Sequence, residues 1–227
     1  MDVSVKESHD YLFKLLCIGE ANVGKTTFLH QYIHDNFANF RSTVGVDVFE
    51  KYVTYNNNQR ILLQLWDTAG QERYRSLTKS LFRDSMGFLL LFDVTNESSF
   101  LSIQEWLTYI DTYTRVDDDF RPPILLIGNK IDLVTNRIVD TIRAQQLANE
   151  LQVVYIETSA VTGTNVQETF RLLVKNVFDF MDQSMQKFYP KSPIIQIPTG
   201  EERYKKRTSG KLITKLCQAK KHSCSCT

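Results

Sequence analysis

The side chains in this sequence that could do chemistry gather in short segments that follow apolar runs. The first segment, residues 19–26, reads GEANVGKT and fits the pattern G-x-x-x-x-G-K-[ST], which is typical of phosphate-binding loops. Glycines let such a loop wrap closely, so that its N–H groups and the next helix N-terminus point at phosphate oxygens. Lys25 adds a positive charge for the β- and γ-phosphates, and the Thr26 hydroxyl is a candidate Mg²⁺ ligand. The residues expected around the phosphates are Gly19, Glu20, Ala21, Asn22, Val23, Gly24, Lys25, Thr26 and Thr27.

A second segment, Asn129-Lys130-Ile131-Asp132, follows the apolar run ILLIG and decides which base is bound. The Asp132 carboxylate can only accept hydrogen bonds, and guanine offers two N–H groups on one edge where adenine offers no such pair. Asn129 can brace the loop, and the stem of Lys130 can lie over the base. Ser159 and Ala160, after the run VVYI, would complete the base pocket through backbone groups.

The third segment, residues 67–72, closes the run ILLQLW and is placed to act on the γ-phosphate. Asp67 can hold Mg²⁺ through water, and Gly70 can offer its N–H to the γ-phosphate without a Cβ in the way. Gln71 can orient the water that attacks the phosphorus. Hydrolysis of GTP to GDP and phosphate is therefore the expected reaction, with Gln71 as its catalytic residue.

Short apolar runs alternate with helix-period segments, which predicts an α/β fold with a mostly parallel sheet covered on both faces. Strands are expected at 12–18, 46–55, 60–66, 86–92, 124–127 and 153–156, and helices at 26–33, 98–113, 141–151 and 165–181. The turn-rich quartet 56–59 predicts a hairpin between the second and third strands. Cys17, inside an apolar run, is expected to be a core residue.

The GTPase domain is expected to span residues 11–183, after a flexible N-terminus at 1–10 and before a basic tail at 184–227, where prolines interrupt any regular element. Residues 183–227 carry ten Lys or Arg and two Glu, a net charge of +8, against 17 basic and 24 acidic residues, −7, in the rest. A basic tail on an acidic body favours an anionic membrane surface as the partner, and does not suggest a nucleic-acid-binding domain. The N-terminus has no apolar run of the signal-peptide kind, so we expect the chain in the cytosol.

Together these motifs resemble the Ras superfamily of small GTPases. The run WDTAGQE at 66–72 and the cysteine-rich end are similar to the Rab family, and residues 76–96 resemble its branch serving secretory granules and lysosome-related organelles. The resemblance implies a six-stranded sheet, GTP and GDP as ligands, Mg²⁺ as cofactor and a monomer. It also implies a switch that regulates vesicle trafficking, docking and exocytosis. The implied partners are an exchange factor, a GTPase-activating protein, a Rab escort protein, a GDP-dissociation inhibitor and vesicle effectors.

Further residues take roles only through this resemblance. Thr43 matches the first-switch threonine that binds Mg²⁺ when a γ-phosphate is present, and Phe37 the aromatic that packs against guanine, with Phe40 as its alternative. The effector triad of the family maps to Val48, Trp66 and Leu81; ordinary packing is the other interpretation of Val48 and Leu81. The chain departs from the family in the stretch between Lys25 and Thr43, which is one residue short.

The last residues, KKHSCSCT, resemble a double geranylgeranylation site at Cys224 and Cys226 that would hold the protein on the cytoplasmic face of vesicle or organelle membranes. Thr227 departs from that pattern. Cys224 as the cysteine of a C-a-a-X box, or unmodified cysteines, remain alternatives.

Two other functions fit part of the sequence. A GTP-loaded scaffold that does not hydrolyse would fit the methyl group of Ala21 near the γ-phosphate and the shortened first switch. A P-loop kinase would need an acceptor-binding lid and would leave Asn129 and Asp132 unexplained.

Overall fold

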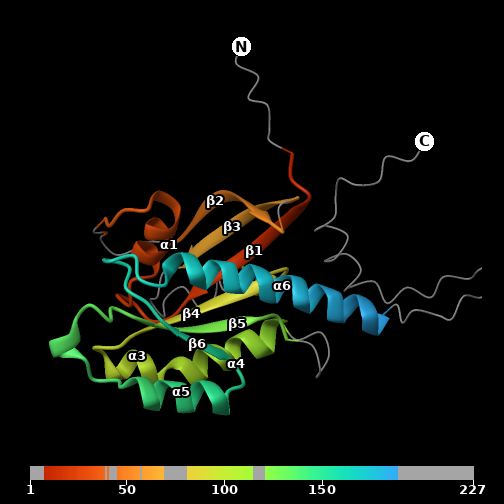
Figure 1. The fold of residues 1–227 in the computed structure, drawn as a ribbon. Helices are drawn as coiled ribbons and strands as arrows, with labels where there is room; N and C mark the ends of the chain where they lie inside the picture. The colour runs from red at the N-terminus through yellow and green to blue at the C-terminus, as the bar shows by residue number, and fades with distance from the viewer. Residues whose placement is uncertain are drawn as a thin grey trace, which may run out of the picture.

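The computed structural model describes residues 8–38, 40, 45–56, 58–68, 81–114 and 121–188. Its centre is a six-stranded sheet in the order β2-β3-β1-β4-β5-β6, with only β2 antiparallel to its neighbour. The strands are β1 (Tyr11–Ile18), β2 (Val46–Tyr55), β3 (Gln59–Thr68), β4 (Gly87–Asp93), β5 (Ile124–Asn129) and β6 (Val154–Glu157). The predicted α/β class and mostly parallel sheet are confirmed (Figure 1).

Helices cover both faces of the sheet, as Figure 1 shows. One face carries α1 (Lys25–His34) and α6 (Val166–Phe188), and the other carries α3 (Glu97–Leu101), α4 (Ile103–Thr114) and α5 (Thr141–Glu150). A short 3₁₀ helix, η2 (Val134–Asn136), precedes α5.

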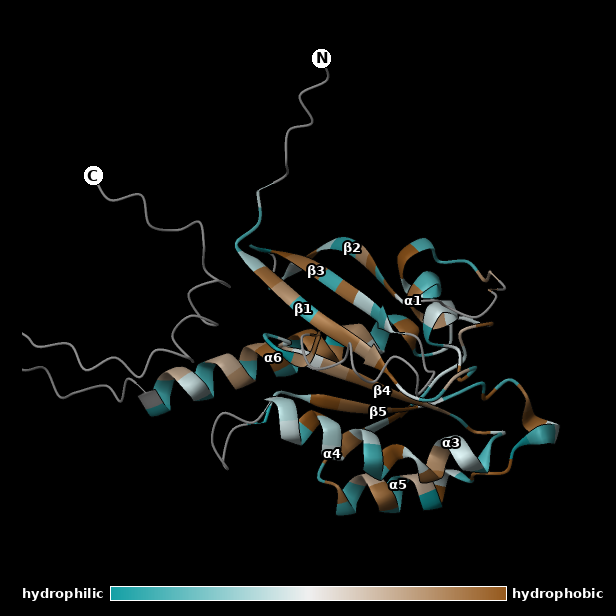
Figure 2. Cartoon of the chain, turned by 180° about the vertical axis from the view of Figure 1, so that it is seen from behind, coloured by the Kyte–Doolittle hydropathy of each residue, from teal (hydrophilic) through white to brown (hydrophobic). Residues whose placement is uncertain are grey.

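Alternation along β1 builds both halves of the core, because successive side chains of a strand point to opposite faces. Phe13, Leu15 and Cys17 pack with α1 and α6, whereas Leu16 and Ile18 pack with α3, α4 and α5. Cys17 is fully buried, as predicted, and burial raises the pKa of its thiol. Figure 2 shows the matching hydropathy, with largely brown strands at the centre and helices banded in teal and brown.

Element boundaries differ from the sequence expectation in three informative places. Gln59, placed in the hairpin turn, instead pairs with Tyr55 at the start of β3, and β3 continues to Thr68. The single helix expected at 98–113 is divided into α3 and α4 at Ser102. The Ser102 hydroxyl donates to the carbonyl of Ser99 (3.0 Å), a local bond that competes with regular helix geometry.

The third difference concerns the predicted domain boundary at 183/184, which falls inside α6. Ser184 is buried, and its hydroxyl donates to the Phe180 carbonyl of the preceding turn. The helix continues to Phe188, two residues before Pro190. Helices usually end at or before the residue that precedes a proline, because the proline ring disfavours helical geometry there. The remaining tail, 189–227, lies outside the described residues.

Candidate functional site

Four segments that carry the predicted chemistry meet at one edge of the sheet. Residues 19–24 follow β1, Asp67 lies near the end of β3, Asn129 ends β5, and residues 158–160 follow β6. Because these four strands are parallel, their carboxyl ends share an edge, the usual ligand-binding edge of an open α/β sheet.

The loop after β1 depends on two glycines that no other residue could replace without strain. Gly19 has φ +139°, and a Cβ there would lie 2.1 Å from the carbonyl oxygen of Leu91. Gly24 has φ +94°, and its Cβ would lie 2.6 Å from Nδ2 of Asn129. The loop is thus packed closely against β4 and the end of β5, and it leads directly into the N-terminus of α1.

Lys25 is almost fully buried at the start of α1, and its ammonium is held by the loop itself. The Nζ atom donates to the carbonyl oxygens of Gly19 (2.9 Å) and Glu20 (2.8 Å). Burial lowers the pKa of the ammonium, while the nearby Cys17, Asp67 and Glu20 raise it in part. The arrangement places a cation where a helix N-terminus and loop amides already favour an anion.

Thr26 and Asp67 form the oxygen-rich side of the site. The Thr26 hydroxyl donates to Oδ2 of Asp67 over 2.5 Å, and Asp67 is fully buried. A hydroxyl and a carboxylate are ligands that Mg²⁺ accepts, usually with waters and phosphate oxygens in the remaining positions. Of the residues described, no group of three or more His, Cys, Asp and Glu could hold a metal by itself. The other residues predicted for this side, Thr43, Gly70 and Gln71, lie outside the described residues.

The Asn129 side chain hydrogen-bonds to both the phosphate loop and the segment after β6. Its amide donates from Nδ2 to the carbonyl of Val23 (2.9 Å). Its Oδ1 accepts from the hydroxyl of Thr158 (3.2 Å) and the backbone N–H of Ala160 (3.3 Å). Asn129 therefore acts as a brace between the phosphate loop and the segment after β6.

The side chains of Lys130 and Asp132 are both held by polar contacts. Lys130 has a left-handed backbone (φ 69°), and its Nζ reaches the carbonyl of Asn22 (2.7 Å) and Oδ2 of Asp93 (2.7 Å). The Ser159 hydroxyl donates to Oδ1 of Asp132 over 2.6 Å. Two residues of the predicted base pocket, Asp132 and Ser159, are thus brought into direct contact.

Asp93 is a site residue that the motifs did not reveal. Its Oδ1 accepts from both the N–H (2.8 Å) and the hydroxyl (2.7 Å) of Thr95, which leaves Oδ2 to hold Lys130. The available signal was a carboxylate closing the apolar strand MGFLLLF, the same pattern by which Asp67 was found.

The aromatic and effector candidates lie on the outer part of the fold. Phe37 is exposed, and Phe40 packs against the His30 ring at 4.9 Å. Val48 and Trp66 face each other across β2 and β3. Val48 is exposed, whereas Trp66 and Leu81 are both half-buried and pack against the same core cluster.

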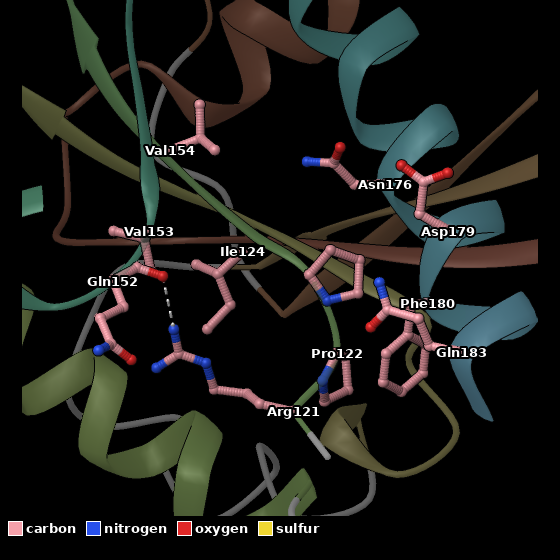
Figure 3. Close-up of a pocket in the computed structure, with 11 residues that line it drawn as sticks. Arg121, Pro122, Ile124, Gln152, Val153, Val154, Asn176, Asp179, Phe180 and Gln183 are labelled. Atoms are coloured by element: carbon pink, nitrogen blue, oxygen red, sulfur yellow. Dashed lines mark hydrogen bonds between the residues drawn. The ribbon is translucent and has the colours of Figure 1, made fainter. Parts of the chain in front are cut away.

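A separate cavity of about 330 Å³ lies at the opposite end of the sheet (Figure 3). Its walls include Ile124 at the start of β5, Val154 at the start of β6, and Phe180 of α6. Arg121 spans its edge and donates to the carbonyl of Gln152 (3.3 Å). The cavity contains none of the predicted site residues and is not the nucleotide site.

No helix among the described residues is long and apolar enough to cross a membrane.

The open α/β sheet and the G-x-x-x-x-G-K-T loop between β1 and α1 are typical of P-loop proteins. The family model described as the Ras family matches residues 14–179. The chain is 45% identical to Ras-related protein Rab-3C of Bos taurus over 81% of this chain and 79% of that protein. It is 42% identical to Ras-related protein Rab-27A of Sus scrofa over 96% and 98% of the two chains. It is also 45% identical to Ras-related protein Rab-3A of Homo sapiens over 80% and 81%.

The chain belongs to the Ras family and, within it, to the Rab proteins. It is a small GTPase that hydrolyses GTP to GDP and works as a switch in vesicle trafficking and exocytosis. Guanine nucleotides are its ligands, and exchange factors, activating proteins, a dissociation inhibitor and effectors are its classes of partner.

Proposed function

We propose that residues 19–27 hold the phosphates of GTP and GDP in this chain. The observation that carries the proposal is the joining of the phosphate loop to the base-side segment through Asn129 and Lys130. A nucleotide has phosphates at one end and a base at the other, so a site for it must fix these two segments relative to each other. The contacts from Asn129 to Val23 and from Lys130 to Asn22 do so.

On the base side, Asp132 reads guanine, Lys130 covers the base plane, and Ser159 with Ala160 closes the pocket. The exposed ring of Phe37 is the proposed aromatic that packs edge-on against guanine, with Phe40 as its alternative. What supports the role of Asp132 is its fixed orientation, since Ser159 holds one carboxylate oxygen.

Thr26, Thr43 and Asp67 are the proposed holders of Mg²⁺, with Asp67 acting through water. The metal would neutralise charge that develops on the β- and γ-phosphates. The residues present fit such an ion, because the Thr26 hydroxyl already lies at the Asp67 carboxylate. Gln71 orients the attacking water, and Gly70 donates its N–H to the γ-phosphate. Unaided hydrolysis is then slow, on the order of 10⁻⁴ per second, as for Ras-type enzymes without an activating protein.

The test is a titration of GDP and GTP with and without Mg²⁺ on wild type and on Lys25→Ala and Asp67→Ala. We expect Lys25→Ala to weaken both nucleotides, and Asp67→Ala to reduce the gain in affinity that Mg²⁺ gives. Unchanged affinities in both variants would remove these residues from the site.

The proposed effector surface is Val48, Trp66 and Leu81. The register supports it, because Val48 and Trp66 are direct cross-strand neighbours and Lys14 lies 4.6 Å from the Trp66 ring. Two aliphatic members make this surface less polarisable than an aromatic triad, which changes partner choice.

The tail is proposed to anchor the GTPase domain to vesicle or organelle membranes through lipid on Cys224 and Cys226. What supports this is the excess of positive charge in residues 183–227, which suits an anionic membrane surface. The GTPase domain is proposed to act as a monomer.

A further inference from the structure

The phosphate loop contains one acidic side chain, Glu20, which lies five residues before Lys25. A carboxylate close to a nucleotide's phosphates repels them, and the repulsion is strong where water is largely excluded. The loop therefore needs either a different residue here or a means of keeping the carboxylate turned away.

The structure shows a partner for this carboxylate on α4. The indole Nε1 of Trp106 donates to Oε1 of Glu20 over 3.2 Å, although the two residues are 86 positions apart. Trp106 is only 7% exposed and belongs to the core cluster beneath α3, α4 and α5. Because the ring is packed, its single N–H donor has a fixed position.

Glu20 also contacts the phosphate-binding lysine, through its backbone. The backbone oxygen of Glu20 accepts from Lys25 Nζ over 2.8 Å. Glu20 thus links a donor fixed in the core to the cation expected to meet the phosphates.

We infer that Trp106 is a positioning residue for nucleotide binding, because its indole N–H holds the Glu20 carboxylate against α4 and away from the phosphates. When the donor is lost, the carboxylate is free to turn toward the phosphates, and nucleotide is released faster. This inference rests on the proposed role of residues 19–27 as the phosphate loop.

The test measures the rate of GDP dissociation from wild type, Trp106→Phe, Glu20→Gln and the double variant. Phenylalanine keeps a packed ring without a donor, and glutamine keeps an acceptor without a charge. We expect Trp106→Phe to release GDP about tenfold faster when Glu20 is present, the size of one hydrogen bond to a charged group. In the Glu20→Gln background the same change should accelerate release by less than about twofold.

An equal acceleration in both backgrounds would mean that Trp106 acts by packing alone, and would overturn the inference. No acceleration in the Glu20 background would overturn it as well. Tyr113→Phe is the matched control, since it also removes a polar atom from an aromatic ring of α4, about 10 Å further along the helix. It should release GDP at the wild-type rate.

Two further measurements distinguish a failure of this inference from a failure of the phosphate-loop assignment and from misfolding of the variant. Unchanged GDP affinity in Lys25→Ala would refute the phosphate-loop assignment itself, whatever the Trp106 variants do. If Trp106→Phe fails to fold, the indole N–H resonance of Trp106 is followed by NMR in Glu20→Gln. It should shift upfield when its acceptor loses charge, and an unshifted resonance would overturn the inference.

Discussion

At the scale of single residues, Asp132 is held in a chain of hydrogen bonds. Ser159 donates to Oδ1 of Asp132 (2.6 Å) and accepts from the N–H of Thr162 (3.1 Å). The hydroxyl is therefore fixed as the donor, and the carboxylate is presented in one orientation. An orientation fixed in this way favours discrimination between bases by the pattern of donors and acceptors.

We predict that Asp132→Asn changes base preference from guanine toward xanthine. An amide presents a donor where guanine also donates, whereas xanthine offers an acceptor there. Competition between GTP and XTP for the purified protein measures the shift, with Ser159→Ala as control. Ser159→Ala should weaken both nucleotides without changing their order, and a variant Asp132→Asn that still preferred GTP as strongly as wild type would contradict the assignment.

Different residues should control the rate of hydrolysis and the preference for GTP over GDP. Gln71→Leu keeps the contacts that bind GTP but cannot orient water, so we expect wild-type GTP affinity with at least about tenfold slower turnover. Thr26→Asn loses the hydroxyl that lies at Asp67, so it should lower GTP affinity relative to GDP in the presence of Mg²⁺. Single-turnover phosphate release beside nucleotide titration checks both. Equal turnover in Gln71→Leu and wild type would remove Gln71 from the mechanism of hydrolysis.

At the scale of elements, the C-terminal end of α1 is held by a lysine from β2. Lys51 Nζ donates to the carbonyl of Tyr32 (2.5 Å) and lies 4.0 Å from the centre of the Tyr32 ring. The last carbonyls of a helix have no partner within the helix, so this bond satisfies one of them. The Tyr32 ring stacks in turn on Phe170 of α6 (3.6 Å), which connects β2, α1 and α6.

We predict that Lys51→Met lowers the free energy of unfolding by about 1 kcal/mol, because methionine keeps the apolar stem but loses the hydrogen bond and the cation–π contact. The melting temperature should fall by roughly 2–4 °C. Lys175→Met is the matched control: Lys175 pairs with Asp179 on the exposed side of α6, and such pairs contribute little. Equal losses in the two variants would show that Lys51 has no special role at the end of α1.

The elements and the motif residues could be predicted because their signals are local. Apolar runs located each of the six strands that the structure describes to within two residues at either end, and G-x-x-x-x-G-K-T placed its loop between β1 and α1. The division of α3 from α4 was missed, since it depends on side-chain hydroxyl bonds near Ser102 that the apolar periodicity does not show. Asp93, Lys51 and Trp106 were missed because their partners lie on other elements, and no spacing within one segment can reveal such a contact.

At the scale of the whole molecule, charge is divided between the folded domain and its tail. The net charge is −7 in residues 1–182 and +8 in residues 183–227. An acidic domain is repelled by an anionic membrane surface, whereas each tail Lys or Arg near it contributes about 1 kcal/mol of attraction. These forces act in opposite directions and are screened by salt within about 8 Å at physiological ionic strength. In the proposed anchoring, charge orients the molecule at the membrane and lipid provides lasting attachment.

The final prediction is that Cys224 and Cys226 each carry a geranylgeranyl chain. Each buried CH₂ contributes about 0.8 kcal/mol, and one chain gives only marginal binding, so the second chain decides how long the protein stays on the membrane. Cys224→Ser or Cys226→Ser should therefore leave a protein that visits membranes reversibly, and the double variant should stay off them; Cys217→Ser is the control. Intact-mass measurement of protein from cells separates the alternatives: two isoprenoid additions support the double site. One addition with loss of residues 225–227 would make Cys224 a C-a-a-X cysteine, and none would refute the anchor.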